Sequence, residues 1–143
     1  MTTNSYYLAL DPGGSTGWAT FTEDGHGITM GTCKTREAVY DLLRATAPQV
    51  IIMEDWITRQ NAQLGGDKLE VVRVIGAVEY FAYLTGSRII LQPNTVKPIA
   101  YRWAGLTKAG SKKDSHERDA YCHGVYYLQR NGIRRPQQGR AEA

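Results

Sequence analysis

Cysteine is scarce in this sequence, and long apolar segments are missing. The two cysteines, Cys33 and Cys122, lie far apart and match no metal-ligand spacing. No apolar run approaches the ~20 residues of a membrane-spanning helix. The opening letters, MTTNSYY, also lack the basic and apolar segments of a signal peptide. We therefore expect no disulfide framework and no membrane segment, and a reduced, cytoplasmic setting is the simplest interpretation.

Positive charge is concentrated in two places. The chain has 143 residues, which suits one domain, and a net charge of +3. Residues 130–143 contain four arginines against one glutamate, so this segment alone carries +3. The segment KAGSKK (108–113) adds three lysines and no acid. Charge alone favours a solvated loop and tail over phosphate contacts, and we expect a domain over 1–132 followed by a flexible basic tail over 133–143.

Short apolar runs separated by turn signals predict the order of the elements. Three strands in an antiparallel meander come first, then a helix capped by Thr35 and closed by Pro48, and strands and helices alternate afterwards. The predicted strands are 6–11, 18–21, 28–30, 50–55 and 88–93, and the later helices are 67–84, 94–103 (capped by Asn94) and 116–130. This order predicts an α/β fold, with a mixed five-stranded sheet flanked by helices.

The longest predicted helix, 67–84, is apolar around most of its circumference. Valine, isoleucine, leucine and aromatic residues occupy positions on nearly every side of it. Such a helix needs cover on nearly all sides, and a small domain offers little beyond one sheet face. Two interpretations stay open: a homodimer interface through this helix, which we favour slightly, or a helix buried within one chain.

Acidic residues end two of the predicted strands. Asp11 follows Leu8-Ala9-Leu10, and Glu54 follows Ile51-Ile52-Met53. One acid after a strand is commonly a simple turn residue, but two at equivalent strand ends favour a site at that edge of the sheet. In the last helix, His116 and Asp119 stand three residues apart and share one face. Asp119 could instead only complement the helix dipole.

These side chains favour a divalent metal centre. Asp11, Glu54 and Asp119 with His116 are ligands that suit Mg²⁺ or Mn²⁺, whereas zinc would favour more histidine and cysteine. Two such ions ~3.5–4 Å apart support phosphodiester hydrolysis. We expect His123, one turn further along the helix, to be a packed and hydrogen-bonded histidine. Asp114 fits a helix-capping role better than a catalytic one.

Five ordered motifs carry a resemblance to a known family. They are LALDPGGSTGWA (8–19), VIIMEDW (50–56), QNAQLGG (60–66), QPNTVK (92–97) and HERDA (116–120). In this order and spacing, from about residue 6 to 128, the chain resembles the RuvC family of Holliday junction resolvases. The resemblance implies a ribonuclease H-like fold. It also implies a homodimer through the 67–84 helix that nicks four-way DNA junctions with two Mg²⁺ or Mn²⁺ ions per active site.

Several residues take expected roles from this resemblance. Asp11, Glu54 and Asp119 match the metal-binding catalytic acids, and His116 matches a position that holds Asp or His in the family. Candidates for DNA contact are the basic residues Arg59, Lys97, Lys108, Lys112 and Lys113. Trp56 could stack on an unpaired base, or it could be an ordinary tryptophan of the rim or core. The stretch before the last helix is shorter than in usual members. This departure suggests a compact, bacteriophage-encoded form that also cuts other branched DNA.

Three other functions remain possible from the residues. A dimer could recognise branched DNA without cutting it, and a related nuclease could act on RNA. The D-P-G-G-S-T-G segment (11–17) also resembles the first phosphate loop of actin-like ATPases and sugar kinases, where Ser15 and Thr16 could bind phosphate. Those enzymes need two such domains, and this chain has room for one.

Overall fold

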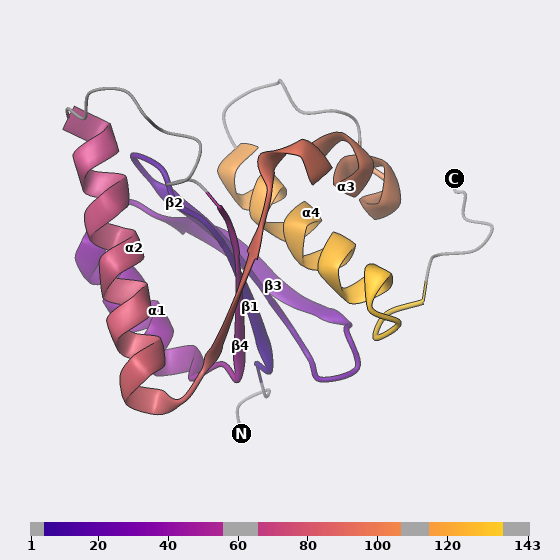
Figure 1. Cartoon of the computed structure of the whole chain (residues 1–143), viewed down its shortest axis with the longest axis horizontal. Helices are drawn as coiled ribbons and strands as arrows, with labels where there is room; N and C mark the ends of the chain where they lie inside the picture. Colours follow the sequence, from indigo (N-terminus) through magenta and orange to yellow (C-terminus); the bar gives the residue numbers. More distant parts are fainter. Residues whose placement is uncertain (1–4, 56–65, 107–114, 136–143) are drawn as a thin grey trace.

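A five-stranded sheet lies between two layers of helices (Figure 1). The computed structural model describes residues 5–55, 66–106 and 115–135. The strands are β1 (Tyr7–Asp11), β2 (Thr16–Phe21), β3 (Gly27–Cys33), β4 (Val50–Glu54) and β5 (Arg88–Gln92). The helices are α1 (Arg36–Thr46), α2 (Gly66–Thr85), the 3-10 turn η2 (Asn94–Val96), α3 (Lys97–Ala104) and α4 (Ser115–Arg130).

The sheet is mixed, with strand order β3-β2-β1-β4-β5. β1 pairs antiparallel with β2, and β2 pairs antiparallel with β3, which confirms the predicted meander. β4 pairs in parallel with both β1 and β5, as expected for its continuous apolar sequence. The α/β fold with a mixed five-stranded sheet is therefore confirmed.

Alternation along the central strands separates two core clusters, one on each face of the sheet. Leu8 and Leu10 of β1 pack in the cluster that contains residues of α1 and α2, whereas Ala9 packs in the cluster that contains residues of α4. β4 alternates in the same way, with Ile52 on the α4 side. Because side chains on a strand repeat every two residues, Asp11 shares the α4 face with Ala9.

The same alternation puts Glu54 beside Asp11. Glu54 lies two residues beyond Ile52, so it also faces α4. The register of the parallel pair sets Leu10 opposite Met53, one residue before the two acids. The ends of two neighbouring strands thus bring two carboxylates to one edge and one face of the sheet.

One predicted helix start is confirmed and one is wrong. The Thr35 side chain accepts a hydrogen bond from the Ala38 backbone N–H at 3.1 Å, which is the predicted cap of α1. Asn94 does not cap a helix with its side chain; it begins the 3-10 turn η2 after Pro93. α3 starts only at Lys97, with a proline in its first turn, where the missing N–H has no intrahelical partner to lose.

Two glycines allow α4 to approach the sheet closely. A Cβ atom added to Gly17 of β2 would lie 2.1 Å from the backbone carbonyl of His116 in the first turn of α4. One added to Gly124, in the middle of α4, would lie 2.4 Å from the ring of Phe21. The helix therefore contacts β2 at backbone distance, which fixes where its first turn lies relative to β1.

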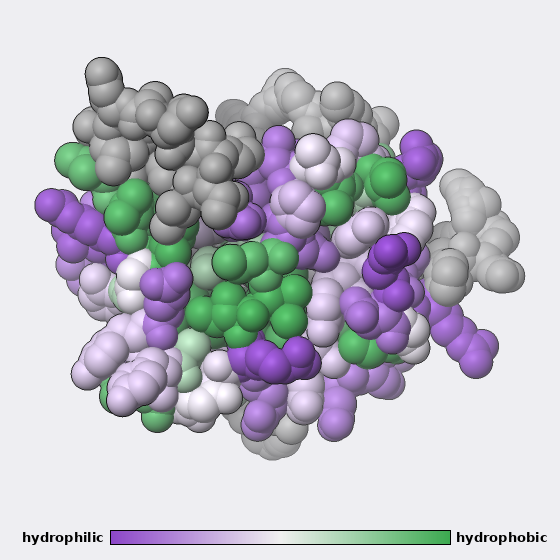
Figure 2. Space-filling view, in the orientation of Figure 1, coloured by the Kyte–Doolittle hydropathy of each residue, from purple (hydrophilic) through white to green (hydrophobic). Residues whose placement is uncertain are grey.

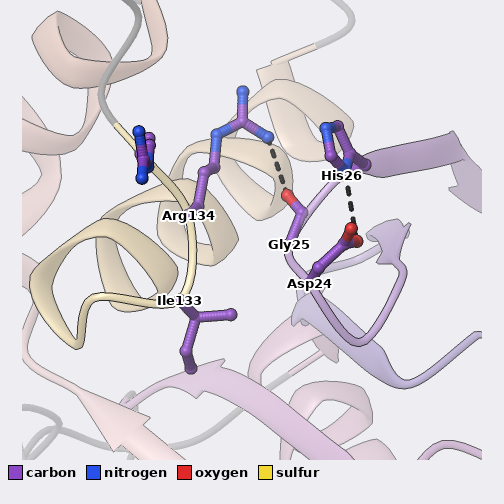
Figure 3. A pocket seen from close by; sticks show the side chains of 6 residues that line it. Asp24, Gly25, His26, Ile133 and Arg134 are labelled. Carbon is purple, nitrogen blue, oxygen red and sulfur yellow. Dashed lines mark hydrogen bonds and ion pairs between the residues drawn. The ribbon is translucent and has the colours of Figure 1, made fainter.

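The far end of α4 is held by the turn between β2 and β3 (Figure 3). Arg134 donates from Nη1 to the carbonyl oxygen of Gly25 at 3.0 Å, and its guanidinium lies 6.0 Å from the Tyr121 ring centroid. A hollow of about 300 Å³ between this turn and residues 133–135 is lined by Asp24 and His26. The described part of the chain ends at residue 135, so most of the tail predicted over 133–143 lies outside it.

The outer face of α2 exposes large apolar and aromatic side chains. Tyr80 is 62% exposed, Tyr83 81% and Leu84 61%. Figure 2 shows a further hydrophobic patch over β5, the neighbouring edge strand, where Leu91 is exposed. The interpretation of this helix as fully buried within one chain is therefore wrong. Within the described ranges, no helix combines the length and apolar character needed to cross a membrane.

Candidate functional site

Two carboxylates lie side by side at the ends of β1 and β4. Asp11 is 6% exposed and Glu54 4%. Burial raises the pKa of Asp11 above its usual value, and a hydrogen bond from His116 opposes this shift. Buried carboxylates without compensation are costly, so this edge of the sheet needs positive charge close by.

The first turns of α4 bring a histidine and a third acid to the same place. His116 Nδ1 lies 3.1 Å from Asp11 Oδ2, and this hydrogen bond raises the pKa of His116, against the lowering caused by burial. Asp119, one turn along the same face, is also buried. Gly13 leaves room for the histidine, because an added Cβ there would lie 2.8 Å from the His116 ring.

Lys97, at the start of α3, lies among the acids. Its Nζ is 3.2 Å from Asp119 Oδ2 and 3.8 Å from Glu54 Oε1. Burial alone would lower the pKa of Lys97, but the three carboxylates around it raise it above its usual value. The ammonium therefore balances part of the negative charge of the site. The DNA contact predicted for Lys97 stays a prediction, since here its Nζ pairs with protein carboxylates.

Tyr101 holds Asp119 from the other side. The phenol donates to Asp119 Oδ1 at 2.5 Å, while Lys97 Nζ donates to Oδ2. Desolvation raises the pKa of Tyr101, and the neighbouring carboxylate adds to this, so the phenol stays protonated and donates. Sequence analysis missed this residue. The available signal was its spacing of four residues from Lys97, which puts both on one face of a helix.

Replacing Tyr101 with Phe should lower the free energy of unfolding by about 1.5–3 kcal/mol, because a buried carboxylate loses a charged hydrogen bond. Urea denaturation followed by circular dichroism measures this change. Tyr40→Phe is the matched control, since Tyr40 is exposed on α1 and its variant should differ by less than ~0.5 kcal/mol. A Tyr101→Phe protein as stable as the parent would contradict the assigned contact.

A buried pair, Gln92 and His123, lies behind Glu54. His123 is fully buried in α4, and Gln92 at the end of β5 donates to its Nδ1 at 3.1 Å. The prediction of a packed, hydrogen-bonded histidine is thus confirmed. Gln92 was missed, although its place at the end of a strand parallel to β4 is the same signal that pointed to Asp11 and Glu54.

The donor set suits a hard divalent cation. Three buried carboxylates and one imidazole from β1, β4 and α4 converge at this edge, and carboxylate oxygens are the ligands that Mg²⁺ and Mn²⁺ prefer. Among the described residues, no three acids, histidines or cysteines stand close enough together to form a ready metal site. The same side chains instead contact one another and their neighbours: His116 pairs with Asp11, and Lys97 and Tyr101 donate to the two oxygens of Asp119.

The other predicted contact residues lie outside the described part of the chain. They are Trp56, Arg59, Lys108, Lys112 and Lys113, together with the possible cap Asp114. Of the predicted site residues, the structure brings together Asp11, Glu54, His116, Asp119 and Lys97.

Comparisons with known proteins identify the fold. No protein-family model matches the chain, and a search of curated proteins finds no match. The chain is similar to T. thermophilus RuvC in complex with a Holliday junction substrate, with a TM-score of 0.60 and 17% identity, covering 92% of this chain and 98% of that one. It is also similar to a second Thermus thermophilus RuvC structure, with a TM-score of 0.58 and 18% identity, covering 92% and 99%. The mixed five-stranded sheet and its flanking helices are those of the RuvC, ribonuclease H-like fold.

Proposed function

We propose that this protein is a structure-selective DNA endonuclease that resolves Holliday junctions and other branched DNA. The observation that carries the proposal is that three buried carboxylates, Asp11, Glu54 and Asp119, surround Lys97 at one edge of this fold. Buried acids beside a lysine and a histidine are typical of a functional site, whereas acids in a surface cluster are exposed to solvent. The similar RuvC structure was solved with a Holliday junction, which supports a branched substrate for this chain.

The proposed chemistry is phosphodiester hydrolysis assisted by Mg²⁺ or Mn²⁺. Asp11, Glu54 and Asp119 would hold two ions, with His116 as a further ligand. When bound, such ions supply charge stabilisation for the phosphate and lower the pKa of a water molecule. The chain's own residues orient the acids: Tyr101 holds one oxygen of Asp119, and His116 holds Asp11.

Lys97 has a separate proposed role at the site. Its ammonium contacts two of the acids, and its side chain is 30% exposed. An ammonium at that place attracts a phosphate of the DNA backbone as well as the carboxylates, without reading the base sequence. We propose that it moves from the carboxylates to a phosphate when cations and DNA are bound.

The test is to incubate the protein with labelled four-way, flap and linear duplex DNA, with and without Mg²⁺, and to map the nicks. We expect symmetrical nicks near the branch point that need the metal, and no cutting of linear duplex. Junction binding without any cutting in Mg²⁺ or Mn²⁺ would favour a non-catalytic binding module. Binding of ATP in calorimetry, with no junction binding, would favour the phosphate-loop alternative.

We also propose a homodimer through α2. A helix face with Tyr80, Tyr83 and Leu84 exposed next to an apolar patch on β5 provides the type of surface that subunit interfaces bury. This face lies on the opposite side of the sheet from the acids, so pairing through it leaves both acid clusters open. A dimer carries two acid clusters, which matches a substrate in which two strands are cut.

The double variant Tyr80→Glu/Tyr83→Glu should convert the dimer to a monomer. Two buried charges at an aromatic interface raise the dissociation constant at least ~100-fold. Size-exclusion chromatography with light scattering should give twice 15.9 kDa for the parent and 15.9 kDa for the variant. Met30→Glu is the control, because Met30 is exposed on β3 at the other edge of the sheet. A parent protein that is monomeric at micromolar concentration would contradict this proposal.

The cellular setting follows from the same proposal. Cys33 and Cys122 are both free and buried, which is compatible with the cytoplasm proposed for a junction resolvase. The bacteriophage origin, and the division into a domain over 1–132 and a tail over 133–143, stay predictions.

A further inference from the structure

The buried amide of Gln92 has only one orientation that satisfies its neighbours. Its Nε2 lies 3.1 Å from His123 Nδ1 and 3.0 Å from the backbone carbonyl oxygen of His123. An amide nitrogen has two N–H groups and can donate to both. If the amide were turned over, its oxygen would face the carbonyl oxygen, and two acceptors would meet in a buried place. The contact with the carbonyl therefore fixes the amide.

The fixed amide in turn fixes the proton of His123. Because Gln92 Nε2 is a donor, Nδ1 of the imidazole must accept, and it carries no proton. The single proton of the neutral ring then lies on Nε2. Burial also lowers the pKa of His123 to about 4, which agrees with a neutral ring.

The Nε2 proton is directed toward Glu54. Nε2 lies 3.9 Å from Glu54 Oε1, and it is a buried atom that has no hydrogen-bond partner among the residues that the structure describes. A buried N–H without a partner destabilises the folded protein, because it has lost its hydrogen bond to water. A shift of Glu54 by less than an ångström toward the ring would complete a hydrogen bond to Oε1, the same oxygen that lies 3.8 Å from Lys97 Nζ.

We propose that Gln92 and His123 are positioning residues for Glu54: Gln92 keeps the proton of His123 on Nε2, and this N–H fixes one carboxylate oxygen of Glu54. The other oxygen of Glu54 is then oriented for a cation, which is the part of the inference that rests on the proposed function. Neither side chain touches the substrate. Residues that orient a metal ligand in this way typically change metal affinity by about 10- to 100-fold when replaced.

The first test needs neither metal nor DNA. In the full chain labelled with ¹⁵N-histidine, long-range ¹H–¹⁵N spectra distinguish the two neutral tautomers and the imidazolium. We expect His123 as the neutral Nε2–H tautomer between pH 5.5 and 8, and Gln92→Leu should let the Nδ1–H form appear. An Nδ1–H ring or an imidazolium in the parent protein would overturn the proposal.

The second test compares two substitutions of His123 that place an amide group where one or the other ring nitrogen lies. The amide of His123→Gln can reach the place of Nε2, whereas that of His123→Asn reaches only the place of Nδ1. Calorimetric titration with Mn²⁺ alone should show binding weakened about 10- to 100-fold in His123→Asn, with most of it recovered in His123→Gln. The control His26→Asn replaces an exposed histidine in the turn between β2 and β3 and should leave Mn²⁺ binding unchanged.

The outcomes separate this inference from the proposed function. If the protein binds Mn²⁺ and the two His123 variants differ as expected, but no branched DNA is cut, the nuclease proposal fails and the positioning role stands. If folded His123→Asn binds Mn²⁺ as well as the parent, the positioning role is overturned even in an active nuclease. If the parent binds no Mn²⁺, the metal-dependent part of both proposals fails, and the tautomer spectrum alone decides whether Gln92 and His123 direct a proton at Glu54.

Discussion

Replacing Asp11 with Asn should abolish cleavage of a four-way junction while leaving junction binding intact. The substitution keeps the shape of the side chain but removes a negative charge from the set of proposed metal ligands. Loss of about 4 kcal/mol of transition-state stabilisation lowers the rate about 1,000-fold. Single-turnover cleavage assays in Mg²⁺ measure this loss, and gel-shift assays in Ca²⁺ measure binding. Glu54→Gln and Asp119→Asn should behave in the same way.

Stability measurements distinguish this effect from unfolding. Burial raises the pKa of Asp11 in the folded protein, so the ionised side chain destabilises the fold at pH values above its unfolded pKa. Removing that charge at pH 7 should therefore leave the melting temperature unchanged or higher. Asp41→Asn, an exposed carboxylate on α1, is the control and should retain full cleavage. An Asp11→Asn protein that still cuts junctions near the parental rate would refute the role of this acid.

Replacing Gly17 with Ala should destabilise the protein by about 3 kcal/mol or more. The added methyl group would overlap the backbone of α4 at His116, so one of the two backbones must shift. The first turn of α4 would have to move away from β2, and His116 and Asp119 would move with it. Chemical denaturation measures the loss, and whatever folded fraction remains should bind Mn²⁺ weakly.

The matched control is Gly27→Ala on the neighbouring strand β3. A Cβ atom there would meet the Tyr121 ring at 3.4 Å, an ordinary contact, and the position is exposed. This variant should differ from the parent by less than ~1 kcal/mol. Equal effects of the two substitutions would show that glycine flexibility, rather than the close approach of α4, decides stability at Gly17.

The strands and the acids at their ends could be predicted because the signals are local. Apolar runs and turn residues locate β1 and β4, and an acid that follows each run must lie at the same edge when the strands are parallel neighbours. The cap at Thr35 is equally local, since it involves a backbone N–H three residues away. The motif order added the expectation of a ribonuclease H-like fold, and the structure confirms it.

The residues around the acids could not be predicted in this way. Tyr101 reaches Asp119 only because α3 packs on α4, where Trp103 stacks on Tyr126 with ring centroids 5.1 Å apart. That packing depends on tertiary contacts. The turn η2, which sets the direction of α3, is only three residues long and shows no periodic pattern in the sequence. Likewise, the polar role of Gln92 depends on a histidine that lies 31 positions further along the chain.

The alternation of β4 has a consequence for which genetic changes this chain tolerates. Met53 packs toward α2 and the next residue, Glu54, faces α4, so adjacent residues of this strand belong to opposite layers. Deleting one residue ahead of Met53 would exchange the two faces, moving the Glu54 carboxylate into the apolar layer and Met53 to the face that packs on α4. Exchanging one aliphatic residue of β4 for another lowers the stability far less than such a shift of register within the strand. Over time its residue count should therefore stay constant while its aliphatic residues interchange.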